Sequence, residues 1–312
     1  MPDFDAAAGY WDREIIDQTH VSWMANRQVR DYINEMISGT PEMWPLDWFE
    51  SVTKKRKFRR ALSIGCGTGG MERDLVRRGV AAAVDAFDGS VHSLYLARTA
   101  ADAEGMGKAI RYFAADFNEP RLPRATYDLV IFHQSLHHVG KLEKLLREVL
   151  LSMVPGALLY IDEFVGPSRH TWKPSDIAPH QAMWQMVPEN VRYVRELPLP
   201  INWEDPSEGI RSGEIVEQLA VGFRTLVERD YGGTLLATLF PAIHWPAAPP
   251  DLVGKLIESE RSLLKTGFIS YCKVGVLEPK RGFAKQVARL QYFLVPKMKR
   301  LLFEVRRRVG KS

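Results

Sequence analysis

The middle of the chain alternates short apolar runs with segments whose apolar residues recur at helical spacing. The runs have the length of buried strands, and glycine or polar residues stand where each strand would end. Strands that alternate with helices at this rhythm form a parallel, doubly wound sheet, whose ligands gather at the carboxyl ends of the strands. The pattern predicts strands at 61–64, 80–87, 110–115, 127–133 and 157–165, and helices at 71–78, 90–104 and 142–153.

Two further segments flank this pattern. Residues 10–37 place aromatic and aliphatic side chains among charged ones at mostly helical spacing, and Gly39 with Pro41 ends the segment. We expect a pair of helices that packs against the sheet, within an N-terminal helical cap of residues 1–50. The segment 166–222 contains several tryptophans and prolines. A long insertion at the edge of a sheet is typical of a lid that shapes a substrate site.

A glycine-rich turn, Gly65 to Gly69 (GCGTG), follows the first predicted strand. Glycine adopts backbone angles that a Cβ disfavours, and it lets a ligand approach the main chain at the N-terminus of the following helix. The turn therefore predicts a ligand at this point. The spacing of Gly65, Gly67 and Gly70 also fits the turn of nicotinamide-dependent dehydrogenases, so the turn alone does not identify the ligand.

Acidic residues follow two later strands. Asp88 closes the second strand about twenty residues after the glycines, where a carboxylate can accept both hydroxyl protons of a ribose. Asp85 is the alternative, but it is expected within the strand. Asp116 and Phe117 follow the third strand, where an acid can bind an exocyclic amine and an aromatic ring can cover a purine. These positions predict a site for an adenine nucleoside.

Five segments now stand in a specific order: LSIGCGTGG, AFDGSVHSLYLAR, AADF, YDLVIFHQSLHHV and ALLYIDEF. In this order they resemble the motifs of class I S-adenosylmethionine-dependent methyltransferases. The resemblance implies S-adenosyl-L-methionine as cofactor and a Rossmann-like seven-stranded sheet with an antiparallel last strand, closed by segments 223–230 and 268–277. It implies cofactor contacts from Gly65, Cys66, Gly67, Gly69, Asp88, Gly89, Asp116, Phe117, His133 and Gln134.

The chain departs from the family pattern at Ser63, where the family usually has an acid two residues before the first glycine. A contact to the methionine half of the cofactor is therefore expected to be weaker or to come from another residue. A dehydrogenase is disfavoured, because hydride transfer has no equivalent requirement for Asp116-Phe117 or for the His137-His138 loop. The flanks FVGPSRHTW, DPSEGIRSGEI and RDYGGTLL are similar to bacterial methyltransferases of glycan and secondary-metabolite pathways.

The candidate catalytic residues are His137, His138 and Glu163. A hydroxyl acceptor must lose its proton, and histidine is the commonest residue for that task. His137 and His138 come directly after the fourth strand, and Glu163 lies at the end of the fifth. The leading hypothesis is methylation of a hydroxyl on a small-molecule or glycan-type acceptor, lipid-linked acceptors included. The alternatives are a C- or N-methyltransferase of a lipophilic metabolite and a non-catalytic cofactor-binding protein. No metal site is predicted.

Charge is distributed unevenly along the chain. The net charge is +4, yet residues 280–312 alone carry eleven basic residues and one acid, so the remainder is acidic. Interleaved apolar and basic residues predict an amphipathic tail that lies on an anionic membrane surface or packs on protein; the acidic remainder argues against nucleic acid.

The sequence also indicates the compartment. The N-terminus resembles no signal peptide, no apolar run would span a bilayer, and Cys66 and Cys272 suit reduced thiols. We expect a cytoplasmic enzyme with the methyltransferase domain at 51–279; contact with the inner face of the membrane is one of the two roles open to the tail.

Overall fold

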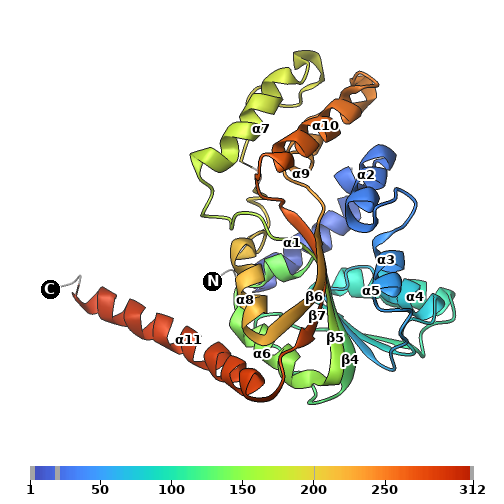
Figure 1. Ribbon diagram of the computed structural model, residues 1–312, viewed down its shortest axis with the longest axis vertical. Coiled ribbons are helices and arrows are strands. Elements are labelled where there is room, and N and C mark those ends of the chain that lie inside the picture. The colour runs from blue at the N-terminus through green and yellow to red at the C-terminus, as the bar shows by residue number, and fades with distance from the viewer. Residues whose placement is uncertain (1–3, 18–21, 200, 310–312) are drawn as a thin grey trace.

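A computed structural model describes residues 4–17, 22–199 and 201–309. Over these ranges seven strands form one sheet in the order β3-β2-β1-β4-β5-β7-β6 (Figure 1). Strands β1 to β5 are parallel, whereas β7 is antiparallel to both of its neighbours, β5 and β6. This confirms the predicted doubly wound sheet with an antiparallel last strand. The strands are β1 (Ala61–Ile64), β2 (Val84–Asp88), β3 (Ile110–Ala114), β4 (Tyr127–His133), β5 (Met153–Phe164), β6 (Phe223–Asp230) and β7 (Cys272–Pro279).

Helices cover both faces of the sheet. Successive strand residues alternate between two buried clusters: Leu129 packs with residues of α2, α3, α4 and α5, and Val130 packs with residues of α6, α8 and α11. This alternation follows from the two-residue period of a strand. The helices are α1 (Phe4–Asp17), α2 (Arg27–Ser38), α3 (Pro45–Val52), α4 (Gly70–Arg77), α5 (Val91–Ala103), α6 (Leu142–Ser152), α7 (Pro174–Met186), α8 (Ile215–Gly222), α9 (Leu236–Leu239), α10 (Leu252–Lys265) and α11 (Gly282–Val309).

Three predicted strand boundaries were wrong. β2 begins at Val84 rather than at 80, because the preceding segment forms only an isolated bridge between Phe58 and Ala81. β5 begins at Met153 rather than at 157: the strand includes Pro155 and Gly156, and its register against β4 shifts there. β7 begins at Cys272 rather than at 268, since the chain first turns at Gly267, whose φ is +87°.

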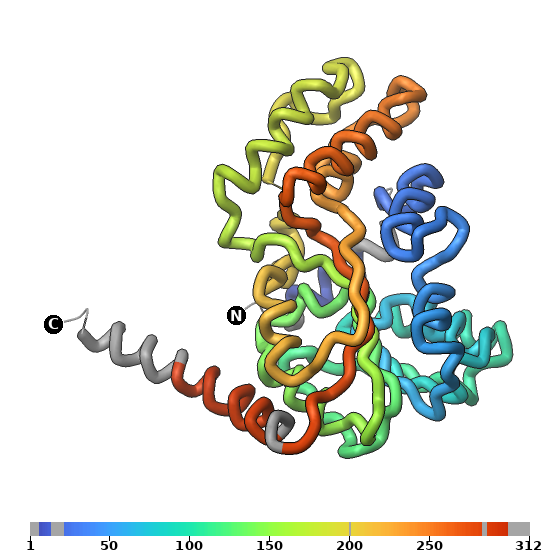
Figure 2. The backbone as a smooth tube through the Cα atoms, viewed as in Figure 1, coloured from blue at the N-terminus to red at the C-terminus, as the bar shows by residue number. Residues whose placement is uncertain are grey.

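A layer of helices stands above the carboxyl ends of the parallel strands. Figure 2 shows α7 and α10 rising side by side from that end of the sheet, while α11 leaves from the opposite end. The layer comes from two insertions, one after β5 and one between β6 and β7. The sequence indicated only the first insertion as a lid, and α8 at its end packs on α6 instead. The second insertion is held by Glu260, whose buried carboxylate accepts hydrogen bonds from the backbone N–H groups of Gly233, Leu235 and Leu236.

The first part of α11 packs on the sheet region through α6 and α8. Ala288 and Tyr292 are buried in the cluster that contains α6 and α8, and the Tyr292 hydroxyl donates a hydrogen bond to the Gln218 carbonyl. Leu290, Phe293, Leu294 and Met298 of the same helix are exposed. Within the described ranges, no helix has both the length and the apolar character needed to cross a bilayer. The division into residues 1–50, 51–279 and 280–312 stays a prediction.

Candidate active site

The glycine turn joins β1 to α4 beneath a cavity at the carboxyl ends of the strands. Gly65 has a φ of +75°, and a Cβ there would lie 2.3 Å from the Cβ of Ser135 on the loop after β4. Gly69 also has a φ of +75°, and a Cβ there would lie 2.4 Å from the Tyr112 hydroxyl. Both positions therefore need glycine for conformation and for space. Gly67 lies between these two positions. A Cβ there would meet nothing within 4 Å, so its main chain is open to a ligand.

Asp88 is the last residue of β2 and faces this turn. Its Oδ2 accepts a hydrogen bond from the Gly67 N–H at 2.8 Å, and its Oδ1 accepts one from the Ser90 N–H at 2.9 Å. Burial raises the pKa of Asp88, although the two backbone hydrogen bonds favour the ionised form. Each carboxylate oxygen keeps a further lone pair that can accept a hydroxyl proton. Asp85, by contrast, lies within β2 and pairs with Arg60 and Arg111.

The cavity has a volume of about 370 Å³ and contains most of the residues predicted from the sequence. Four predicted residues, Gly69, Asp116, His137 and Glu163, do not line it. Gly69 precedes α4, and the Asp116 carboxylate accepts a hydrogen bond from the Asn118 N–H at 2.7 Å. The lining residues that the sequence indicated are Gly65, Cys66, Gly67, Asp88, Gly89, Phe117, His133, Gln134 and His138. Those that it did not indicate include Ala7, Ala8, Trp11, Asn118, Ser135 and Ser207.

Helix α1 covers the cavity. Its Asp12 carboxylate accepts hydrogen bonds from the Ser90 hydroxyl at 2.6 Å and from the His92 N–H at 3.0 Å, which hold the helix over the start of α5. The sequence favoured core packing for both N-terminal helices. α2 does pack in the core, but Trp11 of α1 lines the cavity. An aromatic residue in an amphipathic helix was the only signal, and such residues are usually part of a core.

Gln134, directly after β4, has a strained backbone conformation. Its φ is +52°, a region that side chains other than glycine rarely adopt. Its side-chain amide donates hydrogen bonds to the Asp162 carboxylate at 3.2 Å and to the Tyr231 hydroxyl at 3.0 Å, which fix this conformation. Strain of this kind persists only where the surroundings enforce it, and it is concentrated at functional sites.

His137 lies in the short helical turn Leu136–His138 after β4 and is held by Glu163 of β5. The Glu163 Oε2 lies 2.8 Å from the His137 Nδ1, and its Oε1 accepts hydrogen bonds from the N–H groups of Ser135 and Leu136. Burial opposes protonation of His137, but Glu208, Glu163 and Asp205 outweigh it and raise its pKa to about 9. Glu163 is fully buried and does not line the cavity, so it positions the turn and the ring of His137.

His138 is held in the same way by the lid. Its Nδ1 lies 3.1 Å from the Ser207 hydroxyl and 3.3 Å from the Asp205 Oδ2. Asp205 is buried, and its carboxylate also accepts hydrogen bonds from Ser207 and from the Trp11 indole. Burial acts against ionisation of Asp205, but its hydrogen bonds to His138 and Ser207 outweigh burial and lower its pKa. His138 therefore presents its Nε2 at the rim of the cavity.

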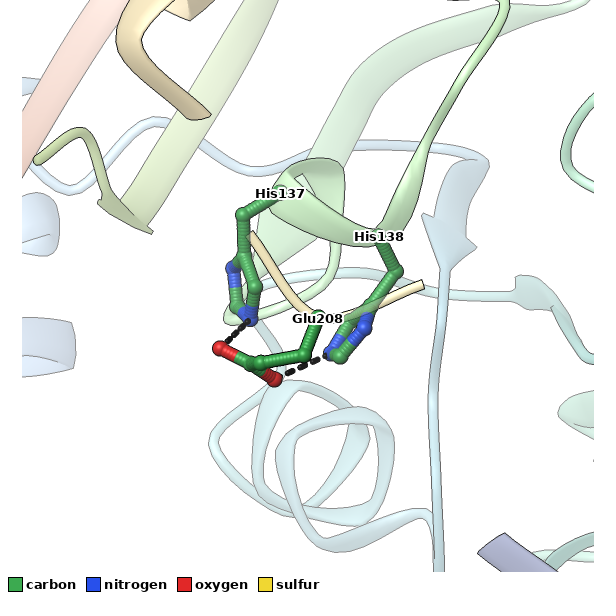
Figure 3. A group of neighbouring side chains, drawn as sticks. All are labelled: His137, His138 and Glu208. Carbon is green, nitrogen blue, oxygen red and sulfur yellow. Dashed lines mark ion pairs between the residues drawn. The ribbon is translucent and has the colours of Figure 1, made fainter. Parts of the chain in front are cut away.

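Glu208 completes the group, as Figure 3 shows. Its Oε1 lies 3.9 Å from the His137 Nε2, and its Oε2 lies 3.8 Å from the His138 Nε2. Sequence reasoning missed Asp205, Ser207 and Glu208. Their segment, DPSEG, lies about seventy residues after the histidines, and no fixed spacing connects the two.

Glu72 of α4 places a carboxylate under the glycine turn, where the chain has Ser63 in place of the family's usual acid. The Ser63 hydroxyl donates a hydrogen bond to the Glu72 Oε1. Both side chains are buried, and the Glu72 Oε2 has no hydrogen-bond partner among the residues that the structure describes. Burial raises the pKa of Glu72. Glu72 does not line the cavity, so it supports the turn from below.

Residues 61–156 match the family model of a methyltransferase domain. The chain contains a class I S-adenosylmethionine-dependent methyltransferase domain. Its cofactor is S-adenosyl-L-methionine. The cavity fits that molecule: the open main chain at Gly67 adjoins the start of α4, the Asp88 carboxylate has lone pairs for two hydroxyls, and Phe117 offers an aromatic face.

Two known proteins show how far the similarity extends. A sterol 24-C-methyltransferase, erg6, from Aspergillus fumigatus is 24% identical over 106 residues, which cover 34% of this chain and 28% of that enzyme. The crystal structure of the [4+2]-cyclase SpnF is similar with a TM-score of 0.54 and 16% identity, covering 90% of this chain and 98% of that one. The second likeness extends the shared fold beyond the methyltransferase domain to the helical layer.

Proposed function

We propose that this methyltransferase transfers the methyl group to a hydroxyl of a small-molecule or glycan-type acceptor. The observation that carries the proposal is the pair His137 and His138. Each ring has its Nδ1 bound to a buried carboxylate, and each turns its Nε2 toward Glu208 beside the cofactor cavity. A hydroxyl oxygen is a weak nucleophile until it loses its proton, so an O-methyltransferase needs such groups near the acceptor.

The chemistry divides between the cofactor and the chain. The cofactor supplies a methyl group on a sulfonium, which the acceptor oxygen attacks in line as the S–C bond breaks and S-adenosylhomocysteine leaves. The chain must hold the acceptor oxygen close and aligned, exclude water and handle the hydroxyl proton. Trp11 and Ser207 line the cavity, and the Trp11 indole is bound by the Asp205 carboxylate of the lid. The acceptor oxygen would lie at the gap among His137, His138 and Glu208.

Glu163 and Asp205 have positioning roles in this proposal. Each fixes a ring by binding its Nδ1, so each directs the Nε2 of that ring. Glu163 was considered as a base from the sequence. Its two oxygens already bind His137 and two backbone N–H groups, which favours positioning over proton transfer.

Two alternatives remain for the acceptor atom. The likeness to a sterol 24-C-methyltransferase supports a carbon acceptor, although it covers only 28% of that enzyme. A nitrogen acceptor would likewise not need the histidine pair. A chain that binds the cofactor without turnover is the third reading, and tight binding without transfer would support it.

The test is a screen of acceptor pools with methyl-labelled cofactor, with the labelled atom identified by mass spectrometry and NMR. We expect the label on oxygen. In the His138→Ala variant turnover should fall by about 10²- to 10⁴-fold, while affinity for S-adenosylhomocysteine stays near that of the parent protein. His244→Ala is the matched control, because His244 is exposed and far from the cavity lining. Label on carbon or nitrogen, or full turnover in His138→Ala, would refute the proposal.

We further propose that α11 brings the enzyme to an anionic membrane surface. The exposed Leu290, Phe293, Leu294 and Met298 lie on a helix in the basic segment 280–312. Apolar residues on a cationic helix enter the interfacial region of anionic bilayers. Such a location would suit a lipid-linked acceptor.

A further inference from the structure

The side chains of His137, His138 and Glu208 face a common gap but lie too far apart to form hydrogen bonds with one another. The two Nε2–carboxylate distances, 3.9 Å and 3.8 Å, exceed the roughly 2.7–3.2 Å of an N–H···O hydrogen bond. One nitrogen from each histidine and one carboxylate oxygen all lie within 4.8 Å of one another. Figure 3 shows the three side chains turned toward one another. Ligands of a cation at about 2.0–2.2 Å lie roughly 3 to 4 Å apart, so modest side-chain rotations would bring these atoms to ligand distance.

The hydrogen bonds on the far side of each ring determine what faces the gap. His137 binds Glu163 through Nδ1, and His138 binds Asp205 and Ser207 through Nδ1. A neutral imidazole whose Nδ1–H donates to a carboxylate carries its lone pair on Nε2. Both lone pairs then point at the Glu208 carboxylate, an arrangement that needs a positive species in the gap. Histidine ligands of metals almost always have this carboxylate support behind them.

A proton is one such species, and it satisfies the group poorly. After a small side-chain rotation a proton on the His137 Nε2 would bond Glu208, but it would leave the lone pair of His138 facing a carboxylate. A divalent cation would bind all three side chains at once.

We propose that His137, His138 and Glu208 bind a divalent transition-metal cation beside the cofactor cavity. Two histidines and one carboxylate are the ligands of catalytic zinc sites and of non-haem iron(II) sites, which keep positions open for water or substrate. His138 also lines the cofactor cavity, so the proposed cation site adjoins it. This departs from the metal-independent site that the sequence predicted. Imidazole ligands select against Mg²⁺, which prefers oxygen.

The role of the open positions rests on the proposed function, whereas the binding of the cation does not. An acceptor hydroxyl bound to the cation would have a lowered pKa and would release its proton to solvent. The oxygen then forms the C–O bond as the S–C bond of the cofactor breaks. The products are the methyl ether, S-adenosylhomocysteine and one proton. Acceptors whose hydroxyl oxygen can coordinate a cation, such as phenols and hydroxy acids, fit this site best.

The test is calorimetric titration of the untagged full-length protein with ZnCl₂, and separately with MgCl₂, after treatment with a chelator. We expect one zinc ion per chain and no heat from magnesium. Glu163→Gln removes support for one ligand and should weaken zinc binding by about 10- to 100-fold. Glu208→Ala and His138→Ala remove a ligand and should weaken it further. Glu204→Gln is the matched control, because Glu204 is exposed in the same lid segment. Thermal unfolding of each variant verifies that it is folded.

Two results would overturn the proposal: no zinc binding at about 100 μM in the parent protein, or unchanged affinity in folded Glu208→Ala and His138→Ala. The proposed function fails separately. Zinc binding together with methylation of carbon or nitrogen would refute the hydroxyl acceptor and leave the cation site standing. Hydroxyl methylation by protein that binds no zinc would refute the cation site and leave the acceptor assignment standing.

Discussion

Replacing Asp88 by asparagine should weaken cofactor binding while the fold survives. Both carboxylate oxygens accept backbone hydrogen bonds, at 2.8 Å from Gly67 and 2.9 Å from Ser90. Asparagine keeps one acceptor oxygen and places an NH₂ group against the other N–H. It also removes the charge that a ribose hydroxyl would bind. A hydrogen bond to a charged group contributes about 1.5–3 kcal/mol, which corresponds to a loss of roughly tenfold to a hundredfold in affinity.

The assay is calorimetric titration with S-adenosylhomocysteine, accompanied by thermal unfolding. Asp85→Asn is the matched control, because Asp85 lies three residues earlier on β2 and pairs with Arg60 and Arg111 instead of lining the cavity. We expect Asp85→Asn to lower the unfolding temperature with little change in affinity. Equal affinity in Asp88→Asn and the parent protein, or a comparable loss in Asp85→Asn, would refute this assignment of the ribose acid.

Two other features lead to predictions. Burial raises the pKa of Glu260, so the folded chain binds a proton that the unfolded chain has lost above about pH 4.5. The free energy of unfolding should therefore fall as pH rises through the raised pKa, and Glu260→Gln should flatten that slope in denaturant titrations; an unchanged slope would contradict it. Truncation after Pro296 should preserve the unfolding temperature and weaken binding to phosphatidylserine vesicles, because it removes seven of the eleven basic residues of the tail but keeps Leu290, Phe293 and Leu294. Salt at 0.1 M should also weaken that binding, because it screens charges beyond about 10 Å. Removal of residues 280–312 should instead destabilise the domain, since Tyr292 is buried against α6 and α8. Vesicle binding of unchanged strength in the truncated protein, or binding that salt does not weaken, would contradict the membrane role.

The sheet and the cofactor side of the cavity were predictable because their signals are local. An apolar run followed by glycines identifies β1 and the turn to α4, and an acid at a fixed distance identifies Asp88. The glycines follow the end of β1 and Asp88 is the last residue of β2, so the ends of these strands determine where the residues lie. The same argument predicts a cofactor contact from Asp116, whose carboxylate accepts a hydrogen bond from the Asn118 N–H and does not line the cavity; that contact stays a prediction.

The acceptor side was not predictable because tertiary contacts assemble it. Asp205 and Glu208 lie in a lid segment whose local sequence indicates only a turn, and they reach the histidines because the Arg169 side chain binds the Asp205 carbonyl and the Ile210 N–H binds the His137 carbonyl. The segment containing α9 and α10 offered no motif. Its helices pack in the core, and the buried carboxylate of Glu260 on α10 binds backbone N–H groups at the start of α9.

Hydrogen bonds connect α1 to the lid, so a movement of one is coupled to a movement of the other. The Trp11 indole donates to the Asp205 carboxylate at 3.1 Å, and the Asn202 amide donates to the Tyr10 hydroxyl at 2.6 Å. Displacing α1 to admit the cofactor therefore pulls on the residue that orients His138. A bound cofactor that stabilises the position of α1 also stabilises the residues around the acceptor. Cofactor and acceptor should therefore each raise the affinity of the enzyme for the other by the same factor. We expect ordered binding, with the methyl donor first and its spent form released last.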